Sequence, residues 1–213
     1  AIWEHAAPAT ITACDPSPGF IEFARRSLSH PEINFEVAGT AELPRHAGGF
    51  DAAAAGLVLN FLPDPGAAVA AMGERLKPGG WLAGYVWDYA EGMQFIKRFW
   101  EAAAEMDPRA AELDEGPRFP LCHPPALAAL LEEAGLERVE VGALEIETHF
   151  ADFEDYWRPF LGGTGPGPAY VAALEADARE ALRLRLRQEL SPNADGPVRL
   201  SARAWAVRGA RGS

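Results

Sequence analysis

Strand-like and helix-like segments alternate along the first 90 residues, and this alternation constrains the fold more than any other feature. Short β-branched or apolar runs at residues 9–15, 33–37, 50–59 and 81–87 are separated by segments whose apolar residues recur at helical spacing. Strands and helices at such short intervals predict parallel βαβ units with right-handed crossovers. The chain is therefore expected to be an α/β protein with a doubly wound, mostly parallel sheet.

Local signals place the helices and turns between these strands. Ser17 followed by Pro18 is typical of a helix start, and Asp64 followed by Pro65 is another. Four consecutive alanines in 50–59 would suit a helix, but the flanking glycines favour a buried strand. Lys77-Pro78-Gly79-Gly80 predicts a turn.

The second half of the chain is less regular, and it predicts a lid of helices on the same domain. Leu182 to Arg187 alternates like a strand, but one apolar stripe through 171–186 and strong helix formers favour a helix. We expect a single domain over residues 1–213, with lid insertions at about 89–121 and 151–190. The other predicted elements are helices near 93–107, 126–134 and 152–161, a loop at 162–168, a turn at 193–196, and strands at 139–150 and 198–207.

Composition excludes several classes of function. The net charge of −12 opposes nucleic-acid binding, which depends on cationic contacts to phosphate. Arg179 to Arg187 is the densest basic stretch, but interspersed glutamates indicate a solvated helix face. The apolar runs are too short to span a bilayer. Cys14 and Cys122 predict neither a disulfide framework nor a metal site, so a cytoplasmic protein that uses no metal is expected. We also expect it to act on small molecules and to exist as a monomer or homodimer.

Asp15 is the first candidate binding residue, because it ends the first strand. Ligands of open α/β sheets bind beyond the carboxyl ends of the strands. A carboxylate there can accept hydrogen bonds from both hydroxyls of a ribose. The same carboxylate could instead serve only the turn before Pro16, and a ribose occurs in both nicotinamide and adenosyl-sulfonium cofactors.

Five segments of the first 90 residues form one series: Asp15 to Arg25, Gly39 to Pro44, Phe50-Asp51, Leu59 to Pro65 and Leu76 to Gly80. Together they resemble the type 11 methyltransferase domain, a class I S-adenosylmethionine-dependent family, and the methyltransferases of ubiquinone and menaquinone synthesis. Shorter matches in the second half resemble a bacterial subgroup. The resemblance implies a Rossmann-like methyltransferase fold with an antiparallel last strand, and methyl transfer from S-adenosyl-L-methionine to a small molecule, giving S-adenosyl-L-homocysteine.

The resemblance also implies roles for particular residues around the cofactor. Asp15 would hold the ribose, Pro16 and Ser17 would shape the turn around the adenosine, and Phe20 would pack near the adenine edge. Thr40 stands where the family often has an aspartate, and Ala41 would offer a backbone N–H to the adenine ring. The residues expected at the methionine half and the reacting methyl group are Gly56, Leu57 and Asn60.

One part of the family pattern is not found in these residues. The family's first strand and its Gly-rich loop lie before the strand at 9–15 and would occupy the middle of the sheet. Without that strand, the strands at 9–15 and 50–59 would each leave backbone groups unpaired. We therefore expect the native protein to have upstream residues that supply this strand and loop.

The sequence does not identify a catalytic base or the acceptor. Asn60, Asp88 and His123 are the candidates near strand ends or on the lid, and His149 lies on a predicted strand. Aromatic side chains suggest a planar or lipophilic acceptor, although the same side chains could simply fill the lid core. The expected acceptor pocket comprises Trp87, Tyr89, Phe99, Trp157 and Phe160.

Two other functions remain open at this stage. A nicotinamide-dependent oxidoreductase would also place an acid at a strand end. A protein that binds S-adenosylmethionine without catalysing a reaction would share the same pocket. A nucleic-acid adenine methyltransferase is disfavoured, because Asn60-Phe61-Leu62-Pro63 lacks the adjacent prolines of that class.

Overall fold

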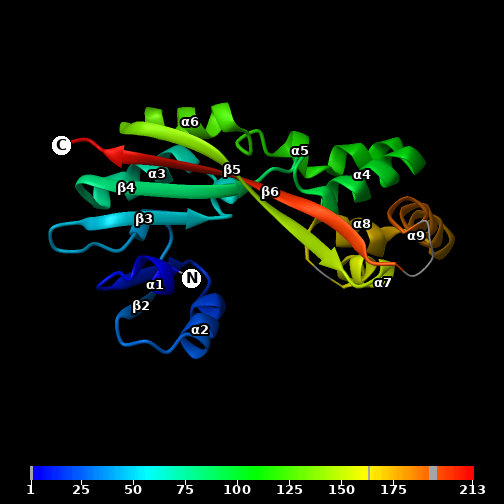
Figure 1. The fold of residues 1–213 in the computed structure, drawn as a ribbon, viewed down its shortest axis with the longest axis horizontal. Coiled ribbons are helices and arrows are strands. Elements are labelled where there is room, and N and C mark those ends of the chain that lie inside the picture. The colour runs from blue at the N-terminus through cyan, green and yellow to red at the C-terminus, as the bar shows by residue number, and fades with distance from the viewer. Residues whose placement is uncertain (1, 163, 192–195) are drawn as a thin grey trace.

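Two long antiparallel strands connect the two lobes of the molecule. The structure is a computed structural model that describes residues 2–162, 164–191 and 196–213. Strands β5 (Leu136–Phe150) and β6 (Val198–Arg211) run from one lobe to the other (Figure 1). They pair along almost their whole length, so the last strand is antiparallel, as predicted.

The larger lobe has the α/β architecture expected from the sequence. Strands β3 (Phe50–Gly56) and β4 (Leu76–Trp87) pair in parallel, and β6 pairs antiparallel to β4. The resulting sheet has the order β3-β4-β6-β5. Strands β1 (Ile11–Asp15) and β2 (Ile33–Val37) also pair in parallel, but as a separate two-stranded sheet. No ladder joins β1 to β3 within the described residues, so each forms one edge of its sheet.

The predicted helix starts are confirmed by their caps. Helix α2 (Pro18–Ser27) begins after Ser17, whose side-chain oxygen accepts a hydrogen bond from the Phe20 N–H. Helix α3 (Pro65–Arg75) begins after Asp64, whose carboxylate accepts one from the Ala67 N–H at 2.8 Å. These bonds satisfy N–H groups that have no partner within the helix.

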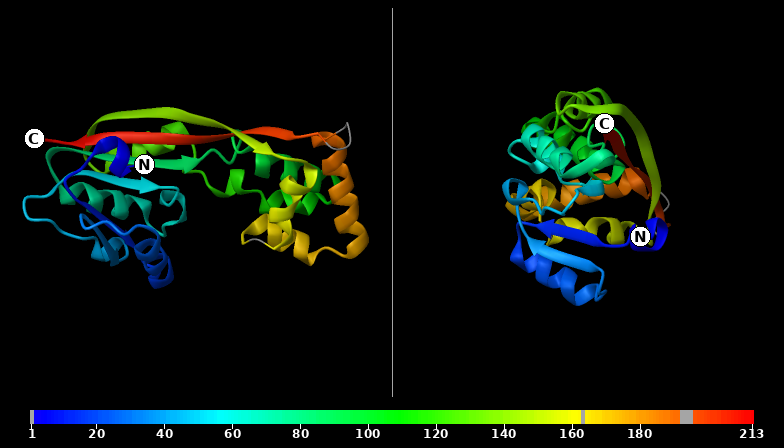
Figure 2. Two further views of the ribbon diagram at one scale, coloured as in Figure 1. Left: turned by 60° about the horizontal axis from the view of Figure 1, so that its bottom comes forward. Right: turned by 90° about the vertical axis from the view of Figure 1, so that its left-hand side faces the viewer.

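Helices α3 and α6 (Pro124–Glu133) cover the four-stranded sheet (Figures 1 and 2). Their apolar sides meet the sheet in one core, which holds the strands by excluding water. The core side chains closed most completely to solvent are Leu59, Val69, Leu76, Leu82, Val86, Leu127 and Leu131.

The smaller lobe is helical and has a core of its own. Its main elements are α4 (Gln94–Met106), α8 (Pro166–Ala173) and α9 (Ala176–Leu190), which pack beside the far ends of β5 and β6 (Figure 1). Aromatic and leucine side chains fill the space between them. The remaining elements are α1 (Ile2–Ala6), α5 (Glu115–Arg118), α7 (Phe153–Trp157) and the 3-10 helices η1 (Thr40–Glu42), η2 (Leu59–Phe61), η3 (Pro108–Leu113) and η4 (Arg158–Leu161).

Several predicted boundaries differ from the structure. The helix predicted through 171–186 is two helices, because the backbone at Leu174 is extended and ends α8. The strand predicted to end at residue 59 ends at Gly56, and η2 follows. The turn at 77–80 is an irregularity inside β4, where the register with β3 shifts. Of the loop at 162–168 and the turn at 193–196, residues 163 and 193–195 lie outside the described residues.

Candidate functional site

Asp15 lies at the carboxyl end of β1, half-buried, with one carboxylate oxygen already engaged. Its Oδ1 accepts a hydrogen bond from the Ser17 N–H at 2.7 Å. This bond closes the turn from β1 into α2, so the capping role considered for Asp15 is present. The turn bond occupies Oδ1 and fixes the orientation of the carboxylate, and Oδ2 accepts no hydrogen bond from a described residue.

Two neighbouring segments place small or exposed groups near the same strand ends. Phe20 is in the first turn of α2 and is 70% exposed. After β2 the chain turns at Gly39 into η1, which carries Thr40 and Ala41, both exposed. These residues therefore present an aromatic face, a hydroxyl and backbone N–H groups to the surface, as the resemblance implies for an adenosine site.

The end of β3 has a strained backbone. Leu57 has a φ of 55°, a left-handed conformation that is unfavourable for a leucine. Its N–H donates to the Tyr85 carbonyl of β4 at 2.8 Å, which holds this conformation. A Cβ on Gly56 would lie 2.7 Å from the Tyr85 hydroxyl oxygen, so a larger residue there would require the Tyr85 ring to move. Strain of this kind persists where surrounding contacts impose it, and it is common at ligand sites.

Asn60 follows in η2 with a buried amide nitrogen that has no partner. Its Nδ2 makes no hydrogen bond in the structure, whereas buried polar atoms normally have one. Next to it, Phe61 is 58% exposed. A ligand with a polar and an apolar part could accept a hydrogen bond from the Asn60 amide and cover the Phe61 ring.

Asp88, immediately after β4, forms a buried ion pair. Its side chain is only 4% exposed, and its Oδ2 accepts from Arg203 Nε at 2.7 Å and Nη2 at 2.6 Å. Its Oδ1 accepts from the Glu91 N–H. The hydrogen bond to Asp88 raises the pKa of Arg203. Because both carboxylate oxygens are engaged, the geometry favours a structural tie between β4 and β6 over proton transfer by Asp88.

The two histidines considered as bases lie on different elements. His123 is exposed at the start of α6, and its side chain makes no capping bond. His149 is near the end of β5, opposite Arg199, and its Nε2 lies 3.2 Å from a Glu147 carboxylate oxygen.

Three aromatic rings meet beside the ends of β3 and β4. Phe119, from the loop before α6, contacts Phe61 with ring centroids 5.2 Å apart and Tyr89 with centroids 5.3 Å apart. Burial raises the pKa of the Tyr89 phenol to about 12, so this side chain is neutral at physiological pH. Only Tyr89 of these three was assigned to the acceptor pocket from the sequence. Phe61 was missed, although its position directly after Asn60 indicates proximity to the strand end.

The other residues expected in the acceptor pocket are placed differently. Trp87 ends β4, half-buried and opposite Ala204. Phe99, Trp157 and Phe160 are each at most 2% exposed and belong to the lid core. The Phe99 and Phe160 rings stack 4.3 Å apart. In this structure these three rings pack against the lid rather than line an open surface.

In the described parts of the chain, no three His, Cys, Asp or Glu side chains are grouped as metal ligands. None of the helices in residues 2–162, 164–191 and 196–213 combines the length and apolarity that crossing a membrane requires.

Solved structures with the same fold are numerous. A protein of Bacillus halodurans C-125, assigned provisionally as a methyltransferase, is 15% identical with a TM-score of 0.57, over 96% of this chain and 84% of that one. A provisional methyltransferase of an antibiotic biosynthesis pathway from Anabaena variabilis is 16% identical with a TM-score of 0.55, over 92% and 80%.

Phosphoethanolamine N-methyltransferase 2 of Haemonchus contortus, solved with S-adenosyl-L-methionine, is 12% identical with a TM-score of 0.52. This chain aligns over 96% of its length but spans only 44% of that protein. At these identities the likeness shows the fold.

The sequence itself matches one family. No curated protein matches it significantly. The family model described as a methyltransferase domain matches residues 1–84, which contain every residue expected to bind a cofactor. Over this segment the chain is similar to the methyltransferase domain family, and as a whole it has the α/β fold of the methyltransferases.

Proposed function

We propose that this protein is an S-adenosylmethionine-dependent methyltransferase that acts on a small, aromatic or lipophilic acceptor. The observation that carries the proposal is the family match over residues 1–84, which spans the ends of β1, β2 and β3. Two features that suit a ligand site, the strained backbone at Leu57 and the unpartnered amide of Asn60, lie just after β3. The fold that this chain shares with methyltransferases solved with the cofactor is further support.

The residues at these strand ends fit the chemistry of the cofactor. S-adenosylmethionine supplies a methyl group that its sulfonium makes electrophilic. Asp15 would accept hydrogen bonds from the ribose through its Oδ2, while Phe20 would cover the adenine. The Asn60 Nδ2 would donate to the methionine half or to the acceptor, which satisfies a donor that is otherwise buried without a partner.

The acceptor would lie against Tyr89, Phe119 and Phe61. These three rings offer an aromatic surface at the ends of β3 and β4. Trp87 would contribute to the same side, and Phe99, Trp157 and Phe160 would support it from the lid core. Because Asp88 is engaged by Arg203 and Tyr89 stays protonated, this site favours an acceptor that is nucleophilic without a protein base.

The proposal includes an additional strand that pairs with both β1 and β3. In β1 the Ile11 N–H and the Asp15 carbonyl bond toward β2, so alternation points the Thr12 and Cys14 N–H groups away from it. Unpaired groups in a sheet interior cost free energy, and an added strand removes that cost. Amide hydrogen exchange of the full-length protein tests this: the Thr12 and Cys14 amides should be protected, and rapid exchange at both would contradict the strand.

Isothermal titration calorimetry with S-adenosylhomocysteine tests the cofactor site. Asp15→Asn keeps an oxygen for the Ser17 turn but removes the charge, so affinity should fall by about 10- to 100-fold, the range expected for charge-assisted hydrogen bonds. Asp114→Asn is the matched control, because Asp114 Oδ1 makes the same kind of turn bond to the Gly116 N–H at 2.9 Å. Equal affinities for the two variants would contradict the assignment of Asp15.

The same titration distinguishes the alternative functions. Binding of NADH in place of S-adenosylhomocysteine would favour an oxidoreductase. Methyl transfer to phenols, quinone precursors, amines and small carboxylic acids would identify the acceptor class. Tight cofactor binding with no turnover of any acceptor would favour a binding protein without catalytic activity.

A further inference from the structure

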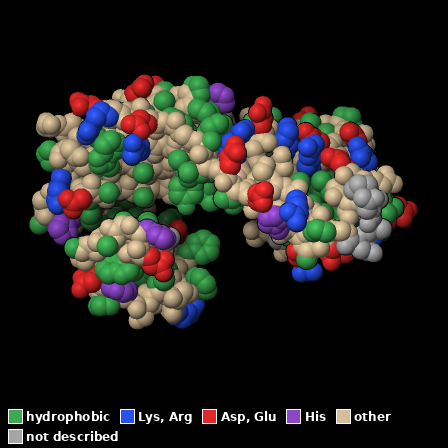
Figure 3. Space-filling view, viewed as in Figure 1, with side chains coloured by type: hydrophobic (Ala, Val, Ile, Leu, Met, Phe, Trp, Pro, Cys, Tyr) green, Lys and Arg blue, Asp and Glu red, His purple; other side chains and the backbone are tan. Residues whose placement is uncertain are grey.

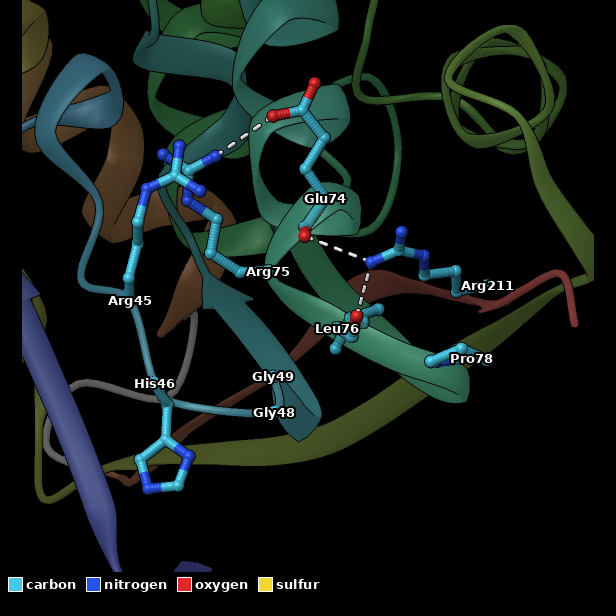
Figure 4. A pocket seen from close by; sticks show the side chains of 9 residues that line it. All are labelled: Arg45, His46, Gly48, Gly49, Glu74, Arg75, Leu76, Pro78 and Arg211. Atoms are coloured by element: carbon cyan, nitrogen blue, oxygen red, sulfur yellow. Dashed lines mark hydrogen bonds and ion pairs between the residues drawn. The ribbon is translucent and has the colours of Figure 1, made fainter.

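A pocket lies at the edge of the sheet opposite the candidate active site. It has a volume of about 270 Å³ and lies where β3 and β4 begin and β6 ends. β3 has 7 residues, so this edge is about 20 Å from the carboxyl ends of the strands. The pocket is therefore separate from the residues assigned to the cofactor. It is lined by Arg45, His46, Gly48, Gly49, Glu74, Arg75, Leu76, Pro78 and Arg211 (Figure 4).

The pocket concentrates positive charge in an acidic protein. Arg45, Arg75 and Arg211 line it with a single carboxylate, that of Glu74, which leaves two positive charges in excess. The chain as a whole has a net charge of −12. Like charges in one pocket repel one another, so an arrangement of this kind is stabilised when an anion lies among them.

Two of the three guanidinium groups have donors that the protein does not use. The Arg75 side chain is only 10% exposed, and although it pairs with Glu74 at 3.1 Å, its buried Nε has no hydrogen-bond partner. Arg45, on the loop before β3, makes no hydrogen bond or ion pair with any described residue. A buried N–H without an acceptor is destabilising, and an oxyanion in the pocket would supply the missing acceptor.

The third arginine and the two glycines give the pocket its shape. Arg211 Nη1 donates to the carbonyl oxygens of Leu76 and of Glu74, at 2.5 and 3.0 Å, so it closes the end of α3 (Figure 4). Gly48 and Gly49 have φ values of 84° and 85°. A Cβ on Gly49 would lie 2.9 Å from the Lys77 backbone nitrogen, so the loop can approach the start of β4 this closely only with glycine.

We propose that this pocket binds a small phosphate dianion, either inorganic phosphate or a phosphate monoester. Guanidinium groups match phosphate oxygens in geometry, and the two excess charges match a dianion better than a monocarboxylate. The volume is below the usual range of pockets for drug-sized ligands, which suits a small anion.

Titrations of the full-length protein at constant ionic strength test the proposal. Inorganic phosphate and glycerol 3-phosphate are each titrated against protein by calorimetry, with sodium acetate as the monocarboxylate control. We expect a Kd of about 1 mM or tighter for at least one phosphate, and the tighter of the two identifies the free or esterified form. In ¹⁵N-resolved NMR spectra the Gly48 and Gly49 amides should shift saturably with that ligand.

Matched arginine variants place the binding in this pocket. Arg45→Gln should weaken phosphate binding roughly tenfold or more, because a charged donor is lost. It lies on an exposed loop, so the fold and the affinity for S-adenosylhomocysteine should not change. Arg26→Gln, at an exposed site on α2 where Arg26 pairs with Glu22, should leave phosphate binding unchanged.

Two results would overturn the proposal. One is the absence of saturable phosphate binding while S-adenosylhomocysteine still binds. The other is equal phosphate affinity in the Arg45→Gln and Arg26→Gln variants, since binding would then lie elsewhere. Neither result depends on methyl transfer, so the phosphate site and the proposed activity fail or stand separately.

Discussion

The buried pair of Asp88 and Arg203 should contribute more to stability than any surface pair of this chain. Arg203→Met keeps the aliphatic part of the side chain but removes the guanidinium, which also lies over Trp205, 4.8 Å from the ring centroid. It removes both hydrogen bonds to a carboxylate whose side chain is 4% exposed. The substitution therefore leaves a buried charge without its main partner.

The size of the effect follows from the burial of the two partners. Breaking a buried ion pair by removing one partner costs about 3–5 kcal/mol. Arg203 is 25% exposed, so solvent screens part of the interaction, and we expect a loss of about 2–4 kcal/mol in the free energy of unfolding. Asp88→Asn in the Arg203→Met background removes the unpaired charge, so the double variant should recover part of this loss.

The wild type, the two single variants Arg203→Met and Asp88→Asn, and the double variant form a double-mutant cycle. Urea unfolding at 25 °C measures the free energy of unfolding of each. The coupling energy between Asp88 and Arg203 should be about 1.5 kcal/mol or more. Arg208→Met is the control on the same strand, because Arg208 makes a similar double contact with Glu140, at 2.7 and 3.1 Å, but at an exposed site. It should cost less than about 1 kcal/mol. Equal losses for the Arg203 and Arg208 variants would refute the reasoning from burial.

Three further outcomes are expected. Gly92→Ala should lower the free energy of unfolding by about 1–3 kcal/mol, measured by thermal or urea unfolding, because the new Cβ would lie 2.4 Å from the Arg203 Cβ. Gly142→Ala is the control and should cost little, because no atom lies within 4 Å of its new Cβ. Burial raises the Tyr89 pKa from 10.0 to about 12, so the protein should lose stability as pH rises between these values, where only the unfolded phenol ionises, and Tyr89→Phe should lose less. Burial also raises the pKa of Cys122 to about 12, whereas Cys14 is exposed. A disulfide reagent at pH 8 should therefore label Cys14 faster than Cys122, and equal rates would contradict the placement of Cys122.

Elements set by short-range signals were predicted well. The caps at Ser17 and Asp64 fix where α2 and α3 begin, because each supplies an acceptor for the next turn. The helix around Leu182 and Leu186 was predicted against an alternating pattern. In α9 both leucines are buried, whereas Leu184 is 46% exposed, as a helical stripe requires.

Other features do not follow from the spacing of apolar residues. The break at Leu174 separates α8 from α9, although the apolar stripe runs across it. The Arg179 side chain donates to the Leu174 carbonyl across this break, and local spacing does not reveal that bond. The role of Asp88 is similar, because its partner Arg203 is 115 residues away.

By itself, the sequence determined the order of strands and helices, the helix caps and the residues at the strand ends. These depend on hydrophobic periodicity and on hydrogen bonds that reach only a few residues along the chain. The antiparallel last strand was expected from the resemblance to the methyltransferase family. Only the tertiary structure decided that Asp88 is held by Arg203, that Phe61 and Phe119 join Tyr89, and that three arginines share one pocket. Burial and charge at these places arise from segments brought together by packing, and no local pattern encodes which segments will meet.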